Sequence, residues 1–221
     1  EVFTIIKYPL VGLLFVFLFL SFYWESVLKT FKLKIYNNIQ RVHEREISRL
    51  GGLSIFIFIF LLIFFYYPDQ KLIKNIMLSS LPFILVSVKE DLFHNTTPLL
   101  RIISMIMSCL LFFYFNPLTF PVIDLPFFGY LLSTNLLSVI FFSFSLILLM
   151  NGMNMIDGMN GLFSLTALFQ LLAVFMISFY LNDFELMQLS LLFIYPLIIF
   201  LIFNFPLGRI FIGDLGAYFY G

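Results

Sequence analysis

Long apolar runs alternate with short polar clusters along this chain. Seven runs are close to the length of a membrane-spanning helix, and we expect a helix at each: Val2–Tyr23, Gly51–Tyr67, Leu72–Val88, Pro98–Phe115, Leu131–Met150, Leu162–Leu181 and Leu186–Phe203. A hydrocarbon core of ~30 Å needs about 20 helical residues, and about 17 suffice when flanking side chains extend to the interface. The runs show none of the two-residue alternation of a transmembrane β-barrel. The pattern predicts an all-α polytopic membrane protein with one integral-membrane domain over residues 1–221.

The polar residues between these runs gather in four clusters, Arg41–Gly52, Lys89–Arg101, Asn151–Gly161 and Asn204–Gly216. The clusters follow the first, third, fifth and seventh runs, so threading the helices through a bilayer places all four on one face. A purely structural membrane protein has little use for such a face. A membrane enzyme with a charged substrate needs one.

The distribution of charged residues predicts how the chain is oriented in the membrane. Residues are 62% hydrophobic and 11% charged, so we expect membrane lipids around the chain. The net charge of zero identifies no partner, and we expect no nucleic acid among the partners. Nine of the 12 lysines and arginines fall on the face of the four clusters. Because basic residues concentrate in cytoplasmic loops, this face is predicted to be cytoplasmic.

Amide and carboxylate side chains recur every three residues in the third cluster, at Asn151, Asn154, Asp157 and Asn160. On the end of a helix this spacing places their oxygens on one side. Oxygen ligands suit Mg²⁺ or Mn²⁺. The alternative is a polar loop that caps the next helix, although a cap needs only one such residue.

Carboxylates also mark the second and fourth clusters. Asp214 lies beside two glycines at a membrane boundary, where a carboxylate is costly unless it is paired, hydrated or bound to metal, and Arg209 could pair with it. Glu90 and Asp91 are adjacent and should repel each other unless a cation lies near them. A solvated charge cluster with Lys89 is the alternative interpretation there.

Basic residues and glycines characterise the first cluster. Gly51 and Gly52 open a helix, so their backbone N–H groups are predicted to be free to bind an anion. Arg49 and its basic neighbours either bind substrate phosphate or meet anionic lipid headgroups. Carboxylates, amides and anion sites on one face together favour a polyphosphate substrate with Mg²⁺, and the membrane location favours a lipid as second substrate.

The clusters resemble the motifs of the polyprenyl-phosphate N-acetylhexosamine-1-phosphate transferases, glycosyltransferase family 4. The matching residues, in the same order and spacing between helices, are Ser48-Arg49-Leu50-Gly51-Gly52, Glu90-Asp91, Asn151 through Gly161, and Ile210 through Gly216. Many members have Asp where this chain has Glu90, and Pro where it has Ser48. The resemblance implies a fold of about ten helices, of which this chain would contain seven and the start of an eighth, truncated at its C-terminus.

The resemblance also implies a reaction. Members transfer a sugar-1-phosphate from a UDP-sugar to undecaprenyl phosphate and release UMP, with Mg²⁺ or Mn²⁺ as cofactor. The sugar expected by default is N-acetylglucosamine, and the product would start cell-surface polysaccharide or cell-wall synthesis. The expected location is the bacterial inner (plasma) membrane with the active site on the cytoplasmic face, and a homodimer is possible because dimers occur in the family.

Roles for single residues follow from the same resemblance. It implies that the metal ligands are Asp214 and Asn154, that Asp91 and Glu90 face the lipid phosphate, and that the remaining substrate contacts come from Asp157, Asn160, Phe211, Asn151, Arg209, Arg49, Gly51 and Gly52. Phe211 would stack on the uracil and Asn160 would lie near it. A phosphate monoester has a second pKa of ~6 and is mostly dianionic at neutral pH. We therefore expect Asp91 to position the lipid phosphate and not to act as its base.

Two other classes remain open from the sequence. One is a transporter or channel for a divalent cation, because carboxylates in membrane helices often line ion pathways. The other is an inactive membrane fragment. The acidic residues crowd one membrane face and show no inverted repeat, which favours the enzyme over the transporter.

Overall fold

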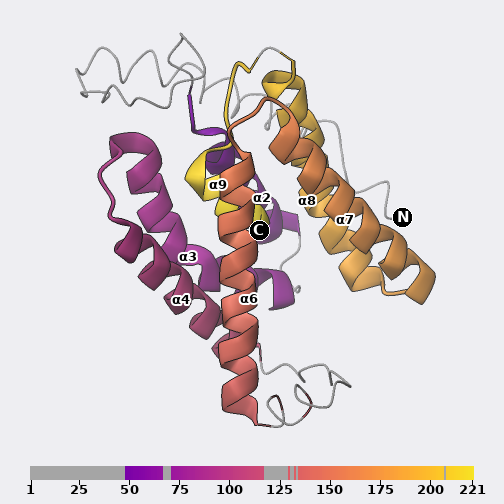
Figure 1. Ribbon diagram of the computed structural model, residues 1–221. Helices are drawn as coiled ribbons and strands as arrows, with labels where there is room; N and C mark the ends of the chain where they lie inside the picture. The colour runs from indigo at the N-terminus through magenta and orange to yellow at the C-terminus, as the bar shows by residue number, and fades with distance from the viewer. Residues whose placement is uncertain (1–47, 67–70, 117–128, 130–131, 133, 207) are drawn as a thin grey trace.

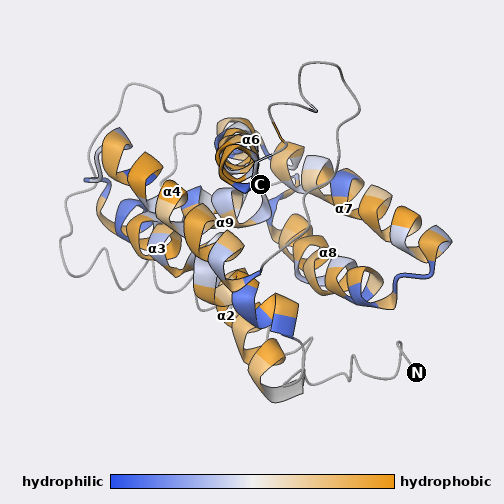
Figure 2. Cartoon of the chain, turned by 90° about the horizontal axis from the view of Figure 1, so that it is seen from below, coloured by the Kyte–Doolittle hydropathy of each residue, from blue (hydrophilic) through white to orange (hydrophobic). Residues whose placement is uncertain are grey.

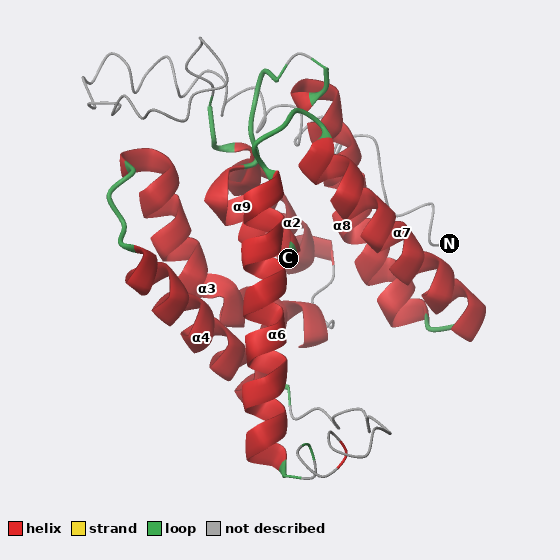
Figure 3. Ribbon diagram, viewed as in Figure 1, coloured by secondary structure: helices red, strands yellow, loops and turns green. Residues whose placement is uncertain are grey.

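The chain folds into helices throughout the part that the computed structural model describes, which comprises residues 48–66, 71–116, 129, 132, 134–206 and 208–221 (Figures 1 and 3). Over these residues the elements are α2 (Gly51–Tyr66), α3 (Lys71–Phe93), α4 (Pro98–Phe115), α6 (Asn135–Ile156), α7 (Leu162–Leu181), α8 (Phe184–Asn204) and α9 (Gly213–Tyr220). The expected all-α class is confirmed. The expected first helix, Val2–Tyr23, lies outside the described residues.

Five of the described helices are long and apolar enough to cross a membrane, namely α3, α4, α6, α7 and α8. The shorter apolar helix α2 has 16 residues. Apolar residues dominate each long helix (Figure 2), and many large hydrophobic side chains are exposed on the outer surfaces of α4, α6 and α7. Such a surface is suited to lipid, because a soluble protein rarely exposes contiguous apolar area of this extent.

Local capping explains several helix boundaries. The Thr97 side chain accepts a hydrogen bond from the backbone N–H of Leu100 at the start of α4, and Pro98 occupies the first turn. Proline is favoured there because its missing N–H has no partner within the helix. Asp183 caps α8 in the same way as Thr97 caps α4. Asn182 ends α7 in the left-handed conformation.

Two helices continue well past the C-terminal ends that the apolar runs predict. α3 continues past Val88 to Phe93, so Lys89, Glu90 and Asp91 lie on its last turns and not in a loop. α6 begins at Asn135 and continues past Met150 to Ile156. Both extensions carry polar side chains of the predicted clusters on a rigid helix end.

The short helix α9 lies at the centre of the molecule. It packs against α2, α3 and α6 (Figures 1 and 2), and Leu215 and Ala217 are fully buried. The hairpins α3–α4 and α7–α8 lie to either side of this centre. Because α9 carries Asp214, the packing of α9 determines where that carboxylate lies.

Close contact between α2 and α9 depends on glycine. A Cβ atom built on Gly52 would lie 2.3 Å from the backbone nitrogen of Gly216 and 2.4 Å from its Cα atom. The backbone of α9 cannot give way without moving the whole helix. The glycine pair therefore allows the two helices to touch backbone to backbone.

A Gly52→Ala substitution is expected to lower the melting temperature of the purified protein in detergent, because overpacking of this kind costs about 1–3 kcal/mol. The matched control is Gly152→Ala in α6, where a Cβ atom meets nothing within 4 Å. Alanine is the better helix former, so the control should melt at the same temperature or slightly higher. Equal melting temperatures for both variants would show that α2 and α9 are not in tight contact.

Candidate functional site

The four polar clusters meet at one end of the helix bundle, and each of the first three contacts the fourth. Ser48 forms a parallel β-bridge with Ile210. The side chain of Asp91 accepts a hydrogen bond from the backbone N–H of Asp214. In the third cluster, the backbone N–H of Gly161 donates to Asn204 Oδ1 at 2.6 Å. The prediction that the clusters share one face is confirmed for the described residues.

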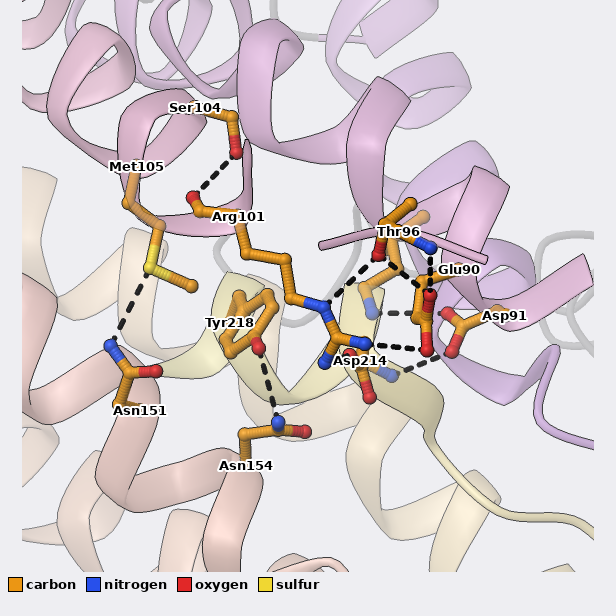
Figure 4. Close-up of polar contacts among 11 residues, drawn as sticks. Glu90, Asp91, Thr96, Arg101, Ser104, Met105, Asn151, Asn154, Asp214 and Tyr218 are labelled. Carbon is orange, nitrogen blue, oxygen red and sulfur yellow. Dashed lines mark hydrogen bonds and ion pairs between the residues drawn. The ribbon is translucent and has the colours of Figure 1, made fainter. Parts of the chain in front are cut away.

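An arginine within an apolar helix joins two of the acidic residues (Figure 4). Arg101 of α4 donates from Nη1 to Asp214 Oδ2 at 2.7 Å, and its Nη2 forms an ion pair with Glu90 Oε1. Its Nε donates to Thr96 Oγ1 at 3.1 Å. One guanidinium thus connects α4 to the carboxylates of α3 and α9.

Glu90 is fully engaged within this group. Its Oε2 accepts hydrogen bonds from the backbone N–H of Thr96 at 2.9 Å and from Thr96 Oγ1 at 2.6 Å, while Oε1 faces Arg101. Lys89, the neighbouring cation in the sequence, is exposed. The ion pair of Glu90 in the described structure is with Arg101. Arg101 instead supplies the positive charge that adjacent carboxylates require.

The pairing predicted for Asp214 is also corrected. Arg209 is exposed, and the ion pair of Asp214 in the structure is with Arg101, more than one hundred positions earlier in the chain. Burial raises the pKa of Asp214, and the nearby charges of Arg101 and Arg49 lower it. The carboxylate is thus held in a partly dehydrated position with cations close by.

The third cluster is not a single row of side chains, because α6 ends at Ile156. Asn151 and Asn154 lie on the helix, Asp157 is its C-cap, and Asn160 lies in the turn that follows. The expected alignment of all four oxygens on one helical side is therefore wrong beyond Asn154. The physical reason is that the glycine-rich segment leaves the helix after Ile156.

Each member of this cluster has its own partner. Asn151 donates to the backbone oxygen of Ile147 at 2.8 Å and to the sulfur of Met105 at 3.6 Å. Asn154 Nδ2 donates to the hydroxyl of Tyr218 on α9 at 3.1 Å. Of the two, Asn154 is therefore the one that contacts the helix carrying Asp214.

Asn160 lies against the loop between α8 and α9. Its Nδ2 donates to the backbone oxygen of Pro206 at 3.2 Å, and a Cβ atom built on Gly208 would meet its amide group. Within the described structure its buried Oδ1 atom has no hydrogen-bond partner.

Asp157 lies near the start of α9. Burial raises its pKa from the usual 3.8 to about 7, while Arg49 and the backbone N–H groups of Gly213 and Ile212 lower it. Because the folded protein favours the protonated carboxyl, folding stability falls as pH rises from 3.8 to about 7 and the penalty is constant above that range.

The substrate-free Asp157→Asn variant should lack this pH-dependent penalty. We expect the melting temperature of the unchanged protein to fall more steeply than that of the variant between pH 5 and pH 7, and the two curves to run parallel at higher pH, because ~7 is the upper end of the titration. Other carboxyl groups titrate in both proteins, so the difference between the curves reports on Asp157. Parallel curves throughout would show that Asp157 titrates normally.

The prediction that the backbone N–H groups of Gly51 and Gly52 are free to bind an anion is wrong. The N–H of Gly51 donates to the backbone oxygen of Phe211 at 3.1 Å, and the N–H of Gly52 donates to the backbone oxygen of Ile212 at 2.7 Å. Both groups are thus used to join α2 to the loop before α9. Arg49 is exposed beside the acidic residues, and its charge acts on Asp91, Asp157 and Asp214.

The donor atoms near Asp214 fit one kind of metal site. No group of three His, Cys, Asp or Glu side chains in the described residues could hold a metal ion alone. Mg²⁺ does not need such a cage, because it binds through one or two carboxylates together with water and substrate phosphates. The Asp214 carboxylate and the amide oxygen of Asn154, whose Nδ2 donates to Tyr218 one turn further along α9, are oxygen donors of the kind that Mg²⁺ prefers.

Arg101 and Tyr218 are the residues that sequence reasoning missed. Arg101 was counted only as a basic residue at a loop, yet it lies four positions into an apolar run. An ionisable residue within a membrane helix is costly and usually functional, and that signal could have identified it. Tyr218 follows Asp214 by four positions, so one face of α9 carries both.

Comparison with known proteins identifies one family. The profile of a family described as Glycosyl transferase family 4 matches residues 73–221, more than half of the chain. The matched region includes α4, α6, α7, α8, α9 and nearly all of α3, and with them Asp91, Arg101, Asn154 and Asp214. No curated protein matches the chain.

Proposed function

Because this chain belongs to glycosyl transferase family 4, we propose that it transfers a sugar-1-phosphate from a UDP-sugar to undecaprenyl phosphate and releases UMP. The family comprises polyprenyl-phosphate sugar phosphate transferases, and the chain is a multi-pass membrane protein. One observation carries the finer proposal. Asp214, Arg101 and Asn154 come from three helices and gather at one end of an apolar bundle.

The proposed reaction is a direct phosphoryl-type transfer. An oxygen of the lipid phosphate attacks the phosphorus attached to the sugar, and a new P–O bond forms as the bond from that phosphorus to the UMP oxygen breaks. UMP leaves with the electron pair of that bond. Positioning and charge stabilisation supply most of the catalysis in such transfers, so no covalent enzyme intermediate is expected.

Arg101 is suited to the anionic phosphates of this reaction. Its planar guanidinium can donate two parallel hydrogen bonds to phosphate oxygens. In the substrate-free structure those donors are occupied by Glu90 and Asp214, which hold the side chain in place. We expect the donors facing Asp214 to contact phosphate when substrate binds.

The remaining assignments are proposals of the same kind. Asp214 and Asn154 would hold Mg²⁺, or Mn²⁺, which when bound neutralises charge on the pyrophosphate and on departing UMP. Asn160, whose buried Oδ1 has no hydrogen-bond partner in the described structure, would lie near the uracil. Phe211 would stack on the ring, and Asp157 would lie at the nucleotide. Arg49 would contribute positive charge near the phosphates.

The biological setting follows from the same proposal. N-acetylglucosamine is the default sugar, and the lipid product would start cell-surface polysaccharide or cell-wall synthesis. The enzyme would act in the bacterial plasma membrane with its site on the cytoplasmic face. It could form a homodimer there.

The test is a UMP-release assay on the purified full-length protein in detergent. It would contain undecaprenyl phosphate, a panel of UDP-sugars and Mg²⁺, with omission of the lipid and addition of EDTA as controls. UMP release that requires both lipid and metal is the expected result, and the panel would identify the sugar. Folded protein that releases no UMP from any donor would overturn the proposal, and metal transport into vesicles would then support the transporter interpretation.

A further inference from the structure

The start of α9 lacks a cap of its own. The N-cap residue is Ile212, whose side chain makes no capping hydrogen bond. The first N–H groups of any helix have no partner within that helix, and leaving them buried without one is costly. The N–H groups of Asp214 and Leu215 lie in this first turn, and both residues are buried.

Asp91 satisfies these groups from another helix. Its Oδ1 accepts a hydrogen bond from the N–H of Asp214 at 2.8 Å, and its Oδ2 accepts one from the N–H of Leu215 at 3.1 Å (Figure 4). Asp91 is 8% exposed. The carboxylate is thus turned toward α9, with both oxygens already bonded.

Gly213 makes this contact possible. A Cβ atom built on Gly213 would lie 2.8 Å from each carboxylate oxygen of Asp91 and 2.1 Å from the backbone oxygen of Arg49. Its φ angle of +74° is one that residues with a side chain rarely adopt. The backbone turn at Gly213 therefore fits the Asp91 carboxylate against the first turn of α9.

We propose that Asp91 is a positioning residue that caps α9 from α3 and thereby fixes the backbone of Asp214, and that it neither removes a proton from the lipid phosphate nor binds it. This inference rests on the proposed function and replaces the sequence expectation that Asp91 faces the lipid phosphate. Asp214 is then fixed twice, at its backbone by Asp91 and at its side chain by Arg101.

Two variants separate capping from charge. Asp91→Asn and Asp91→Ala both remove the negative charge, but asparagine retains one acceptor oxygen and is a good capping residue, whereas alanine is a poor one. We expect the asparagine variant to keep about fivefold more UMP-release activity than the alanine variant, as a difference in capping free energy of ~1 kcal/mol implies. We expect both variants to need more Mg²⁺ for half-maximal activity than the unchanged protein needs.

A base role gives the opposite results. Asparagine cannot accept the proton, so the two variants would be equally inactive and would keep the Mg²⁺ requirement of the unchanged protein. Either of these results would overturn the proposal. The Asp183→Ala variant is the matched control, because it removes the cap of α8 at a position exposed to solvent, and its UMP release should be unchanged.

Hydrogen exchange tests the cap independently of the reaction. In the absence of substrate, the backbone amides of residues 213–216 should exchange slowly in the unchanged protein, faster in Asp91→Asn and fastest in Asp91→Ala. Equal exchange in all three would overturn the capping role. A protein that releases no UMP yet shows this order would contradict the proposed function while leaving the cap established.

Discussion

An Asp214→Asn variant is expected to release UMP about a thousandfold more slowly than the unchanged protein. Metal stabilisation of transition-state charge contributes several kcal/mol, and each ~1.4 kcal/mol corresponds to a factor of ten. Asparagine keeps the volume of Asp214 but not its charge, so both the proposed metal site and the ion pair with Arg101 are weakened. The measurement is the initial rate of UMP release over a range of Mg²⁺ concentrations.

The matched control for this variant is Asp183→Asn. Asp183 is exposed and caps α8, and asparagine caps a helix as well as aspartate does. The control should therefore keep full activity and the same melting temperature. If Asp214→Asn kept its rate to within about tenfold, with an unchanged Mg²⁺ requirement, the assignment of Asp214 as a metal ligand would be wrong.

The sequence correctly predicts both ends of α4 and of α7. The bounds Pro98–Phe115 and Leu162–Leu181 agree with the structure. At the start of α4, Thr97 and Pro98 are capping signals that coincide with the change in hydrophobicity. Local chemistry and hydropathy then point to the same residue.

The predicted C-terminal end of α3 is wrong because its polar side chains have partners far away in the sequence. Glu90 and Asp91 were expected to end a helix, but α3 continues through them. Arg101 neutralises one carboxylate and the N–H groups of α9 satisfy the other. Hydropathy cannot anticipate such partners, because they come from segments elsewhere in the chain.

The site shows the same division between local and distant information. Threading alone predicts that the four clusters share a face, since it depends only on the order of helices. It does not predict which groups pair, and it offered Arg209 for Asp214 because the two are close in sequence. The structure pairs Asp214 with Arg101 instead, and it uses the N–H groups of Gly51 and Gly52 for packing.

An Arg101→Met variant is expected to lose both stability and activity, because Arg101 is the cation shared by two buried carboxylates. The side chains of Glu90 and Asp214 are only 11% and 8% exposed, and Arg101 itself is 24% exposed. Removing one member of a buried ion pair costs about 3–5 kcal/mol, and the partial exposure of Arg101 reduces this to roughly 2–3 kcal/mol. Melting in detergent measures the stability, and UMP release should fall at least about a hundredfold, as expected for a lost phosphate contact.

A second substitution separates the two losses. Glu90→Gln in the Arg101→Met background removes one unpaired charge and keeps an oxygen for Thr96, so the melting temperature should recover in part. Activity should not recover, since no guanidinium remains to contact phosphate. Lys89→Met, which removes an exposed charge next to Glu90, is the control and should match the unchanged protein in both measurements. Recovery of both activity and stability would mean that Arg101 only supports the fold. Failure of the stability to recover would show that Arg101 is not the cation that stabilises both carboxylates.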